Sequence, residues 1–350
     1  MAELFSWPGI LQNLLDRRDL SVSEATWAMR RIMSGDATPS QLAGFLVALR
    51  AKGETVDEIV GFRDAILEAA VPLPVPAAVL DIVGTGGDRF GTVNISSMAS
   101  IVASATGIPV VKHGNKAASS KSGSSDVLAA LGVDLTLSGE RVAEVLAEAG
   151  ITFAFASAFH PGFRHAGATR GELGIPTVFN FLGPLCNPAR AEANAVGVAS
   201  LDRVPLITGV FRTRGATALV FRGDDGLDEL TTTGHSRLWE VSRGDVHEHD
   251  IDPRDLGIPL AEIGDLLGGD ADHNAAVVRR VLDGEAGPVR DIVLLNAAAG
   301  IVAYRLFQDG AEMTRPMLDR LAEARDAAAS AIDSGAAAAK LDAWVGATAR

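Results

Sequence analysis

Three prolines fall within five consecutive positions of the segment VPLPVPAAV, residues 71–79. Proline fixes its own φ and lacks a backbone N–H, so neither a helix nor a central strand tolerates such a run. The segment is therefore expected to be a stiff, extended connection between two folded units. We predict a domain boundary here, with a first unit over residues 1–75 and a second over residues 76–350.

The first unit carries the start signals of several helices. Thr38 and Gln41 are spaced to form a capping box around Pro39, and apolar residues follow at helical spacing. Thr55 and Glu58 repeat the same signal one helix later. With the earlier segment WAMRRIM, these patterns predict a small, mainly helical N-terminal domain.

Short apolar runs alternate with helical patterns in the second unit. The runs are residues 79–83, 108–114, 133–137 and 151–156. One of the helical patterns begins near Ser138 and stops at Gly150, and the alanine-rich residues 324–344 predict one or two terminal helices. Such alternation is typical of a mostly parallel sheet flanked by helices. We therefore predict an α/β fold, with this larger domain following the helical one.

Composition limits the partners of the chain. Lys and Arg total 31 against 44 Asp and Glu, a formal net charge of −13, which opposes binding to a nucleic-acid backbone. The one cysteine, Cys186, permits no intramolecular disulfide and fits a reducing compartment. Neither a secretory leader nor an apolar stretch of about 18 residues is recognisable. We predict a cytoplasmic protein that binds neither nucleic acid nor membrane.

The first polar loop of the second unit is GTGGDRFGTVNISS, residues 84–97, between an apolar run and a helical pattern. Glycines at such a junction let backbone N–H groups approach an anion, and the helix N-terminus adds a favourable dipole. The spacing matches neither of the common nucleotide-binding glycine patterns. A phosphate cradle and an ordinary tight turn are both compatible with this segment taken alone.

A second polar loop follows the next apolar run, within VVKHGNKAASSKSGSSDVLAALG, residues 110–132. Lys112, Lys116 and Lys121 lie there among Asn115 and several serines. Parallel strands bring their carboxyl ends to one edge of a sheet, so both loops should converge on one ligand with more than one phosphate. The alternatives are a solvated loop for the lysines and an ordinary hydrogen-bonded role for His113.

Two further segments carry potential ligand groups. GDDGLDELTTTG, residues 223–234, reads as an acidic surface turn or, beside a polyphosphate, as a site for Mg²⁺. FHPGFRHAGATRGELGIPTVFNFLGPLCNP, residues 159–188, mixes aromatic, basic and glycine-proline positions. The second segment suits a pocket for a small planar acid.

As a set, these segments resemble the motifs of the anthranilate phosphoribosyltransferases, enzymes of tryptophan biosynthesis with the nucleoside phosphorylase/phosphoribosyltransferase fold. The resemblance rests on GTGGD with NISS, KHGNKAASS followed by GSSDVL, the aromatic segment above and DGLDEL. The later GPVRDIVLLNAAAGI fits as well. The motifs occur in order and the resemblance extends over essentially the whole chain.

The resemblance implies transfer of the phosphoribosyl group of phosphoribosyl pyrophosphate (PRPP) to the amino nitrogen of anthranilate, with release of pyrophosphate. It also implies a homodimer formed through the helical unit and a pair of Mg²⁺ ions in each active site. The residues that would line the PRPP site are Gly84, Gly86, Gly87, Asp88, Thr92, Asn94, Ile95, Ser96, Ser97, Lys112, Ser119, Ser120 and Ser124. The metal ligands would be Ser96, Asp228 and Glu229, and the contacts to anthranilate would be Gly84, His113, Asn115 and Arg170. No residue is expected to act as an acid, a base or a covalent nucleophile.

A few positions depart from the common wording of the family. Lys116 stands where arginine is frequent, and Ser97 and Cys186 stand where threonine is frequent. Phe163 replaces a common tyrosine and so removes one hydroxyl from the acceptor pocket. Two alternatives share the architecture: a pyrimidine nucleoside phosphorylase, which uses free phosphate, and a non-enzymatic relative that binds nucleic acid.

Overall fold

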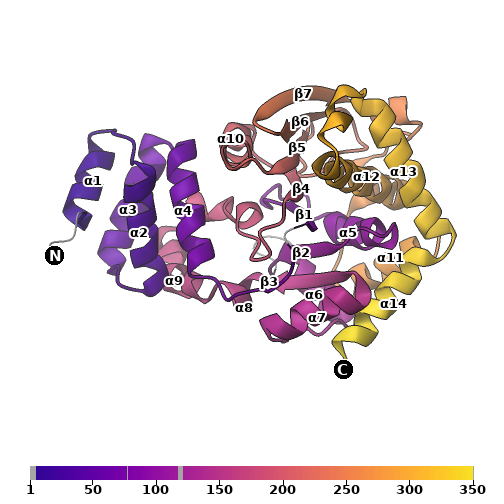
Figure 1. The fold of residues 1–350 in the computed structure, drawn as a ribbon, viewed down its shortest axis with the longest axis horizontal. Helices are drawn as coiled ribbons and strands as arrows, with labels where there is room; N and C mark the ends of the chain where they lie inside the picture. The colour runs from indigo at the N-terminus through magenta and orange to yellow at the C-terminus, as the bar shows by residue number, and fades with distance from the viewer. Residues whose placement is uncertain (1–4, 77, 117–120, 350) are drawn as a thin grey trace.

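The computed structural model describes residues 5–76, 78–116 and 121–349. Within them, a small bundle of helices that begins near the N-terminus lies beside a larger unit built around a sheet (Figure 1). The sheet is mostly parallel and helices flank it. The predicted fold class, an α/β protein with a small helical N-terminal domain, is therefore confirmed.

The helical bundle forms as its capping signals predict. Its helices are α1 (Trp7–Leu15), α2 (Val22–Ser34), α3 (Pro39–Lys52) and α4 (Val56–Glu68). Both predicted capping boxes are present, at the starts of α3 and α4. Phe45 of α3 and Phe62 of α4 are fully buried and pack edge to face with ring centroids 5.8 Å apart. The apolar stripes of these helices therefore face the interior of the bundle.

The bundle also packs against segments from far along the chain. The helix α9 (Arg164–Leu173) contacts α2 and α3, and α10 (Val204–Arg214) contacts α4. Residues 71–76, which follow the bundle, form neither helix nor strand, as their prolines predict. The two units are therefore joined by side-chain packing as well as by an extended connection.

The larger unit contains a seven-stranded sheet within the described residues. Its strands are β1 (Leu80–Gly84), β2 (Val110–Gly114), β3 (Ile151–Phe155), β4 (Ala193–Gly197), β5 (Thr217–Gly223), β6 (Ser236–Ser242) and β7 (Asp245–Ile251). They are ordered β3-β2-β1-β4-β5-β6-β7, and only the pairings β5–β6 and β6–β7 are antiparallel. The order reverses between β1 and β4, which is where parallel sheets bind ligands.

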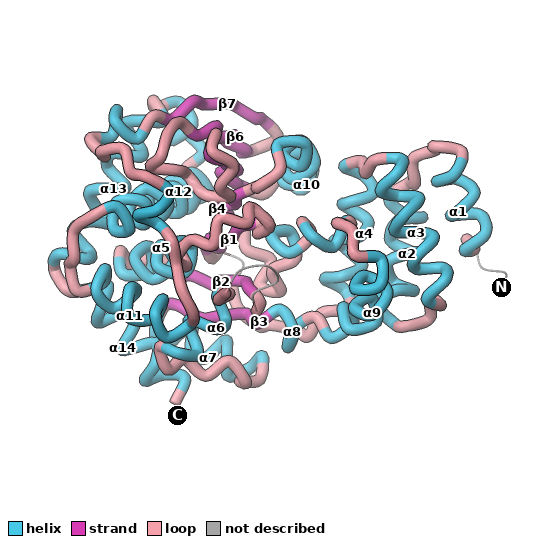
Figure 2. The backbone as a smooth tube through the Cα atoms, turned by 180° about the vertical axis from the view of Figure 1, so that it is seen from behind, coloured by secondary structure: helices cyan, strands magenta, loops and turns pink. Residues whose placement is uncertain are grey.

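Helices cover both faces of this sheet (Figures 1 and 2). Leu219 and Phe221 of β5 join the core that contains α5 (Ile95–Ala105) and the long helix α12 (Pro288–Gln308). Ala218 and Val220 of the same strand join the opposite core, which contains α10 and the helical bundle. The remaining α-helices are α6 (Ser124–Ala130), α7 (Gly139–Ala149), α8 (Ala156–Phe159), α11 (Ala271–Leu282), α13 (Met317–Asp333) and α14 (Ala336–Thr348). No described helix is both long and apolar enough to cross a membrane.

One predicted strand is wrong, because residues 133–137 form no strand in the described structure. The Asp134 carboxylate accepts hydrogen bonds from the Thr136 backbone N–H at 2.8 Å and from the Thr136 hydroxyl at 2.7 Å. The Asp134 N–H donates to the Thr348 hydroxyl of α14 at 3.2 Å. The alternating apolar residues of this segment pack against the core without a strand partner, which explains why the pattern suggested one.

A buried ion pair joins the sheet to α13. Arg320 of α13 and Glu240 of β6 are almost fully buried and form two hydrogen bonds, of 2.6 and 3.0 Å. Because Arg320→Met leaves the buried Glu240 carboxylate with the His249 imidazole, at 3.0 Å, as its remaining side-chain partner, we expect it to lower the free energy of unfolding by up to about 3–5 kcal/mol. Urea denaturation measures this loss. Arg325→Met, which removes a surface pair with Asp326 on the same helix, should cost less than about 1 kcal/mol. Equal losses in the two variants would contradict the role given to the buried pair.

Candidate active site

The candidate site lies where the carboxyl ends of β1 and β4 meet. These strands end at Gly84 and Gly197, which are register partners. A Cβ added to Gly84 would overlap with the carboxylate of Asp228, and one added to Gly197 would overlap with the Asp228 carbonyl. The Gly86 N–H donates to the Asp228 carboxylate at 2.7 Å. Because both strands end in a glycine, which has no Cβ, Asp228 can lie directly against the sheet.

A buried lysine lies beside this carboxylate. Lys112 of β2 is 1% exposed, and its Nζ donates to the Ile82 carbonyl at 2.6 Å and to the Ser96 Oγ at 3.2 Å. Glu229 is also buried, and the nearby backbone N–H of Ser96 acts to lower its pKa against the effect of burial. The predicted metal ligands Ser96, Asp228 and Glu229 are thus brought together around one lysine.

The acidic groups of this cluster repel one another. Burial raises the pKa of Glu229 well above its usual range, and the charge of Asp228 adds to the effect. Burial also raises the pKa of Asp228, and the neighbouring Asp88 reinforces the shift. Burial lowers the pKa of Lys112, while the carboxylates of Asp81, Glu229 and Asp228 act in the opposite direction. The cluster therefore holds more negative charge than its one lysine balances.

Such a set of donors suits a hard divalent cation. Mg²⁺ prefers oxygen ligands and takes one or two carboxylates while it keeps several waters. In the residues that the structure describes, no group of three or more His, Cys, Asp or Glu side chains is arranged to hold a metal ion. A cation bound between Asp228, Glu229 and Ser96 would therefore complete its shell with water or with oxygens of an anionic ligand.

The glycine-rich segment after β1 leaves its backbone open. Gly86, Gly87 and Gly91 have φ values of +67°, +89° and +69°, and a Cβ at any of them would meet no atom within 4 Å. Glycine is therefore needed here for its backbone conformation, not to avoid crowding. Thr92, at the end of this open stretch, forms an isolated β-bridge with a segment much later in the chain.

The first turn of α5 is less open than a simple phosphate cradle requires. The Ile95 side chain is 1% exposed and belongs to the core, so only its backbone faces the loop. The Ser96 N–H lies near the Glu229 carboxylate, and the Ser97 hydroxyl is buried without a hydrogen-bond partner in the described structure. Of these three predicted residues, Ser96 is therefore the one in direct contact with the acidic cluster.

The two polar loops are tied to each other. The Asn94 amide donates to the Ser122 carbonyl at 3.3 Å and makes no capping bond to α5. In the second loop, the Ser124 hydroxyl donates to the Asn115 carbonyl at 3.3 Å. The Asn94 bond links the loop after β1 to the loop after β2, and the Ser124 bond fixes the second loop internally. The predicted residues that lie outside the described part of the chain are Ser119 and Ser120.

His113 and Arg170 lie at the two ends of a row of rings. The centroid distances are 5.2 Å from His113 to His160, 5.4 Å from His160 to Phe163, and 5.7 Å from Phe163 to Phe179. The Arg170 guanidinium carbon lies 5.1 Å from the centroid of the Phe179 ring. No carboxylate in the described residues pairs with Arg170, and burial lowers its pKa. A half-buried arginine without a counter-ion is suited to bind a carboxylate.

Both histidines of this row are held neutral. Burial lowers the pKa of His113 to about 3 and that of His160 to about 4. The His113 Nδ1 lies 3.1 Å from the Gly183 carbonyl, and a carbonyl oxygen only accepts, so Nδ1 carries the proton. Neither imidazole therefore supplies a positive charge at neutral pH.

Comparison with known proteins decides the family. Residues 8–70 match the helical bundle domain of the glycosyl transferase family, and residues 76–338 match its a/b domain. The anthranilate phosphoribosyltransferase of Leifsonia xyli subsp. xyli is 71% identical over 99% of this chain and 100% of its own. This chain belongs to the anthranilate phosphoribosyltransferases. The phosphorylase and nucleic-acid-binding alternatives are therefore set aside.

Solved structures of anthranilate phosphoribosyltransferases share this fold. The enzyme from Thermus thermophilus matches with a TM-score of 0.88 and 42% identity, over 97% of this chain and 99% of its own. A Saccharomyces cerevisiae enzyme in complex with PRPP and Mg matches with a TM-score of 0.87 and 27% identity, over 98% of each chain. The same yeast enzyme in complex with 4-fluoroanthranilate matches with a TM-score of 0.85 and 25% identity, over 98% of this chain and 97% of its own.

Sequence reasoning missed part of the framework of this phosphoribosyltransferase site. Asp81 of β1 is fully buried, accepts from the His113 N–H at 3.0 Å and accepts from the Asn187 amide at 2.9 Å. Burial raises the pKa of Asp81 to about 6. A signal for Asp81 was present, because a carboxylate inside an apolar strand needs partners. Gly197 gave no signal, since only the folded sheet places it against Asp228.

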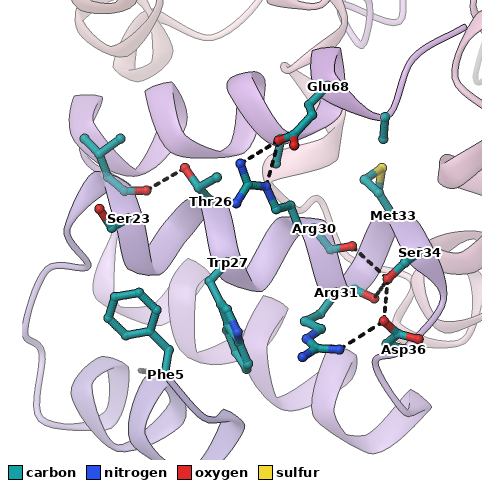
Figure 3. Close-up of a pocket in the computed structure, with 13 residues that line it drawn as sticks. Phe5, Ser23, Thr26, Trp27, Arg30, Arg31, Met33, Ser34, Asp36 and Glu68 are labelled. Atoms are coloured by element: carbon teal, nitrogen blue, oxygen red, sulfur yellow. Dashed lines mark hydrogen bonds and ion pairs between the residues drawn. The ribbon is translucent and has the colours of Figure 1, made fainter. Parts of the chain in front are cut away.

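A hollow of this family member also lies away from this site, on the helical bundle. It is a groove of about 840 Å³ along α2 and α4, with Phe5 and Trp27 on one side (Figure 3). Arg30 is paired with Glu68 at 2.7 Å, and Arg31 is also paired with a carboxylate. Because its arginines are already engaged, the groove is a poor match for a phosphorylated sugar.

The neutral state of His160 predicts a pH-dependent stability. Its pKa is about 4 in the fold and about 6.5 in the unfolded chain, so the unfolded chain takes up a proton first as the pH falls. We expect His160 to reduce stability between pH 6.5 and 4, by up to about 1.4 kcal/mol per pH unit. The measurement is the unfolding free energy of wild type minus that of His160→Phe, at several pH values. As the pH falls, the unfolding free energy of wild type should decrease more than that of His160→Phe. A difference that stays constant with pH would contradict the prediction.

Proposed function

We propose that this chain transfers the phosphoribosyl group of PRPP to the amino nitrogen of anthranilate and releases pyrophosphate, a step of tryptophan biosynthesis. The observation that carries the proposal is the pairing of two unlike subsites. An acidic cluster with open glycine backbone lies at the ends of β1 and β4 beside Lys112 of β2, and an unpaired arginine lies at the far end of the row of rings. The family to which the chain belongs supports the same reaction.

The PRPP subsite is assigned to the two polar loops. The open backbone at Gly87 can donate its N–H group to a phosphate oxygen, and the Lys112 Nζ is held beside Ser96 by its bond to the Ile82 carbonyl. The remaining residues assigned to this subsite are Gly84, Asp88, Thr92, Asn94, Ile95, Ser96, Ser97, Ser119, Ser120 and Ser124. These residues orient the ribose so that its C1 faces the acceptor, which lowers the barrier by alignment.

Asp228, Glu229 and Ser96 are assigned to Mg²⁺. Their carboxylates are buried, repel one another and lie beside the open glycine backbone, so the donor set fits the ion. When bound, Mg²⁺ would stabilise the negative charge that develops on pyrophosphate as its bond to C1 breaks. A pair of ions in each site, one held mainly through PRPP, is the arrangement we propose.

The acceptor subsite is assigned to Arg170 and the row of rings. The planar fork of Arg170 can bind the anthranilate carboxylate through two hydrogen bonds, while Gly84, His113 and Asn115 line the side toward the ribose. An aromatic amine is a neutral nucleophile at pH 7, so no strong base is needed. Burial raises the pKa of the Cys186 thiol to about 12, which argues against a thiolate nucleophile.

Three statements stay predictions: a domain boundary near residue 75, a homodimer formed through the helical unit, and a cytoplasmic location. The matches over residues 8–70 and 76–338 are compatible with that boundary. Sedimentation of the purified protein measures its oligomeric state directly.

The reaction is tested by the loss of anthranilate fluorescence. The complete mixture contains the protein, PRPP, Mg²⁺ and anthranilate, and each component is omitted in turn. We expect the signal to fall only in the complete mixture. If PRPP binds by calorimetry but anthranilate persists, the acceptor is wrong and the PRPP subsite is retained.

Arg170→Ala tests the acceptor subsite. Loss of a charge-assisted pair with a carboxylate removes about 1.5–3 kcal/mol of binding, so the KM for anthranilate should rise about tenfold or more. The KM for PRPP should change little, because Arg170 is separated from the acidic cluster by the row of rings. Arg164→Ala, an exposed arginine of the same helix, is the control and should change neither constant. Equal rises in both KM values would remove Arg170 from this role.

Asp228→Asn tests the metal site. The substitution keeps the size of the side chain and removes one anionic oxygen, so the Mg²⁺ concentration for half-maximal rate should rise about tenfold or more. The direct measurement is binding of Mn²⁺ alone, counted by electron paramagnetic resonance. Asp224→Asn, an exposed aspartate four residues earlier, should bind Mn²⁺ like wild type. Unchanged Mn²⁺ binding in Asp228→Asn would exclude the residue as a ligand.

A further inference from the structure

The loop that carries Asp228 and Glu229 is held from the interior of the protein by a single amide. Asn296 lies in the middle of α12 and is fully buried among apolar residues. Its Oδ1 accepts from the Leu230 N–H at 2.9 Å, and its Nδ2 donates to the Leu230 carbonyl at 2.9 Å. The Nδ2 also donates to the Ile292 carbonyl at 2.9 Å. Both backbone groups of the residue after Glu229 are therefore fixed by one side chain.

A second side chain restrains the same loop from the solvent side. The Asp225 carboxylate accepts from the Leu227 N–H at 2.9 Å and from the Thr231 and Thr233 hydroxyls at 2.6 Å each. Leu227 precedes Asp228, and Leu230 follows Glu229. The two acidic residues are thus held between a buried amide on one flank and an exposed carboxylate on the other.

The loop needs restraint on both sides of Asp228 and Glu229. Two adjacent carboxylates that lie in a cluster with excess negative charge repel each other, and a free loop would relieve the repulsion by moving them into water. Leu230 lies in no strand or helix, so its backbone groups need a partner from elsewhere. The partner comes from α12, where the Asn296 side chain bonds both the N–H and the carbonyl of Leu230.

We propose that Asn296, assisted by Asp225, is a positioning residue that holds Asp228 and Glu229 at the spacing needed to bind a divalent cation. Asn296 touches neither the cation nor the substrates and acts through the backbone of Leu230. The inference rests on the proposed function, because the carboxylates are assigned to the metal there. Groups that orient metal ligands typically contribute 10–100-fold to metal affinity.

The test compares two buried asparagines. Asn296→Leu keeps the volume and removes the amide, and Asn194→Leu is the matched control. Asn194 lies near the start of β4, away from the carboxyl ends, and its Nδ2 donates to the Ala191 and Thr217 carbonyls at 3.1 Å each. Mn²⁺ alone is titrated into each full-length protein and counted by electron paramagnetic resonance, with urea stability measured in parallel.

We expect Asn296→Leu to weaken Mn²⁺ binding about tenfold or more, and Asn194→Leu to leave it within about twofold despite a comparable loss of stability. The KM for anthranilate should stay unchanged in both. Equal weakening in the two variants, or none in Asn296→Leu, would overturn the proposal. If Asp228→Asn also binds Mn²⁺ normally, the metal site itself is wrong; if only Asn296→Leu binds normally, the metal site stands and the positioning role fails.

A surface pair keeps the proposal testable if Asn296→Leu does not fold. Asp225→Ala and Asp224→Ala remove the same charge from adjacent exposed positions, but only Asp225 bonds the loop. Mn²⁺ binding should weaken in Asp225→Ala and not in Asp224→Ala. Equal behaviour of the pair would show that local charge, not restraint of the loop, governs metal affinity, and would overturn the proposal.

Discussion

The contact of Asp228 with two glycines is the constraint on which the site depends. Gly84 and Gly197 end adjacent parallel strands in register, and neither leaves room for a Cβ beneath Asp228. This packing brings a loop from beyond β5 across the point where the strand order reverses. Glu229 then reaches the Ser96 N–H at the start of α5, so that elements far apart in sequence form one acidic cluster.

The cluster is organised for binding at the expense of stability. Carboxylates raised in pKa by burial and by each other oppose folding, and the buried Lys112 offsets only part of that repulsion. The loop keeps this arrangement because it is held both by local bonds to Asp225 and by long-range bonds from Gly86 and Asn296. A bound cation would add the positive charge that the carboxylates lack and could then attract a pyrophosphate group, so binding of one should favour binding of the other.

Short-range patterns predicted much of this structure. The capping boxes at Thr38 and Thr55 and the apolar runs over residues 79–83 and 108–114 depend on neighbours in sequence, and the structure has the boxes and a strand within one residue or two of each run. The grouping of Ser96 with Asp228 and Glu229 was implied by the family resemblance, whereas the rule that parallel strands share one binding edge predicted that the two polar loops converge. The strand predicted at 133–137 failed because hydrogen bonds to Asp134 and α14 were invisible in its apolar alternation. Asn296 was visible as a lone amide in an apolar helix, but its partner is 66 residues away.

The proposed acceptor subsite depends on how the helical bundle packs against the larger unit. Arg170 lies on α9, which packs on α2 and α3, whereas His113 belongs to β2. The rings of His160, Phe163 and Phe179 span the space between them, and their contacts set its width. Because the rings are neutral and Phe163 carries no hydroxyl, they offer an aromatic ligand shape and stacking but no charge. The only charge in this row is Arg170, so discrimination between an aromatic acid and an uncharged arylamine must come from that residue.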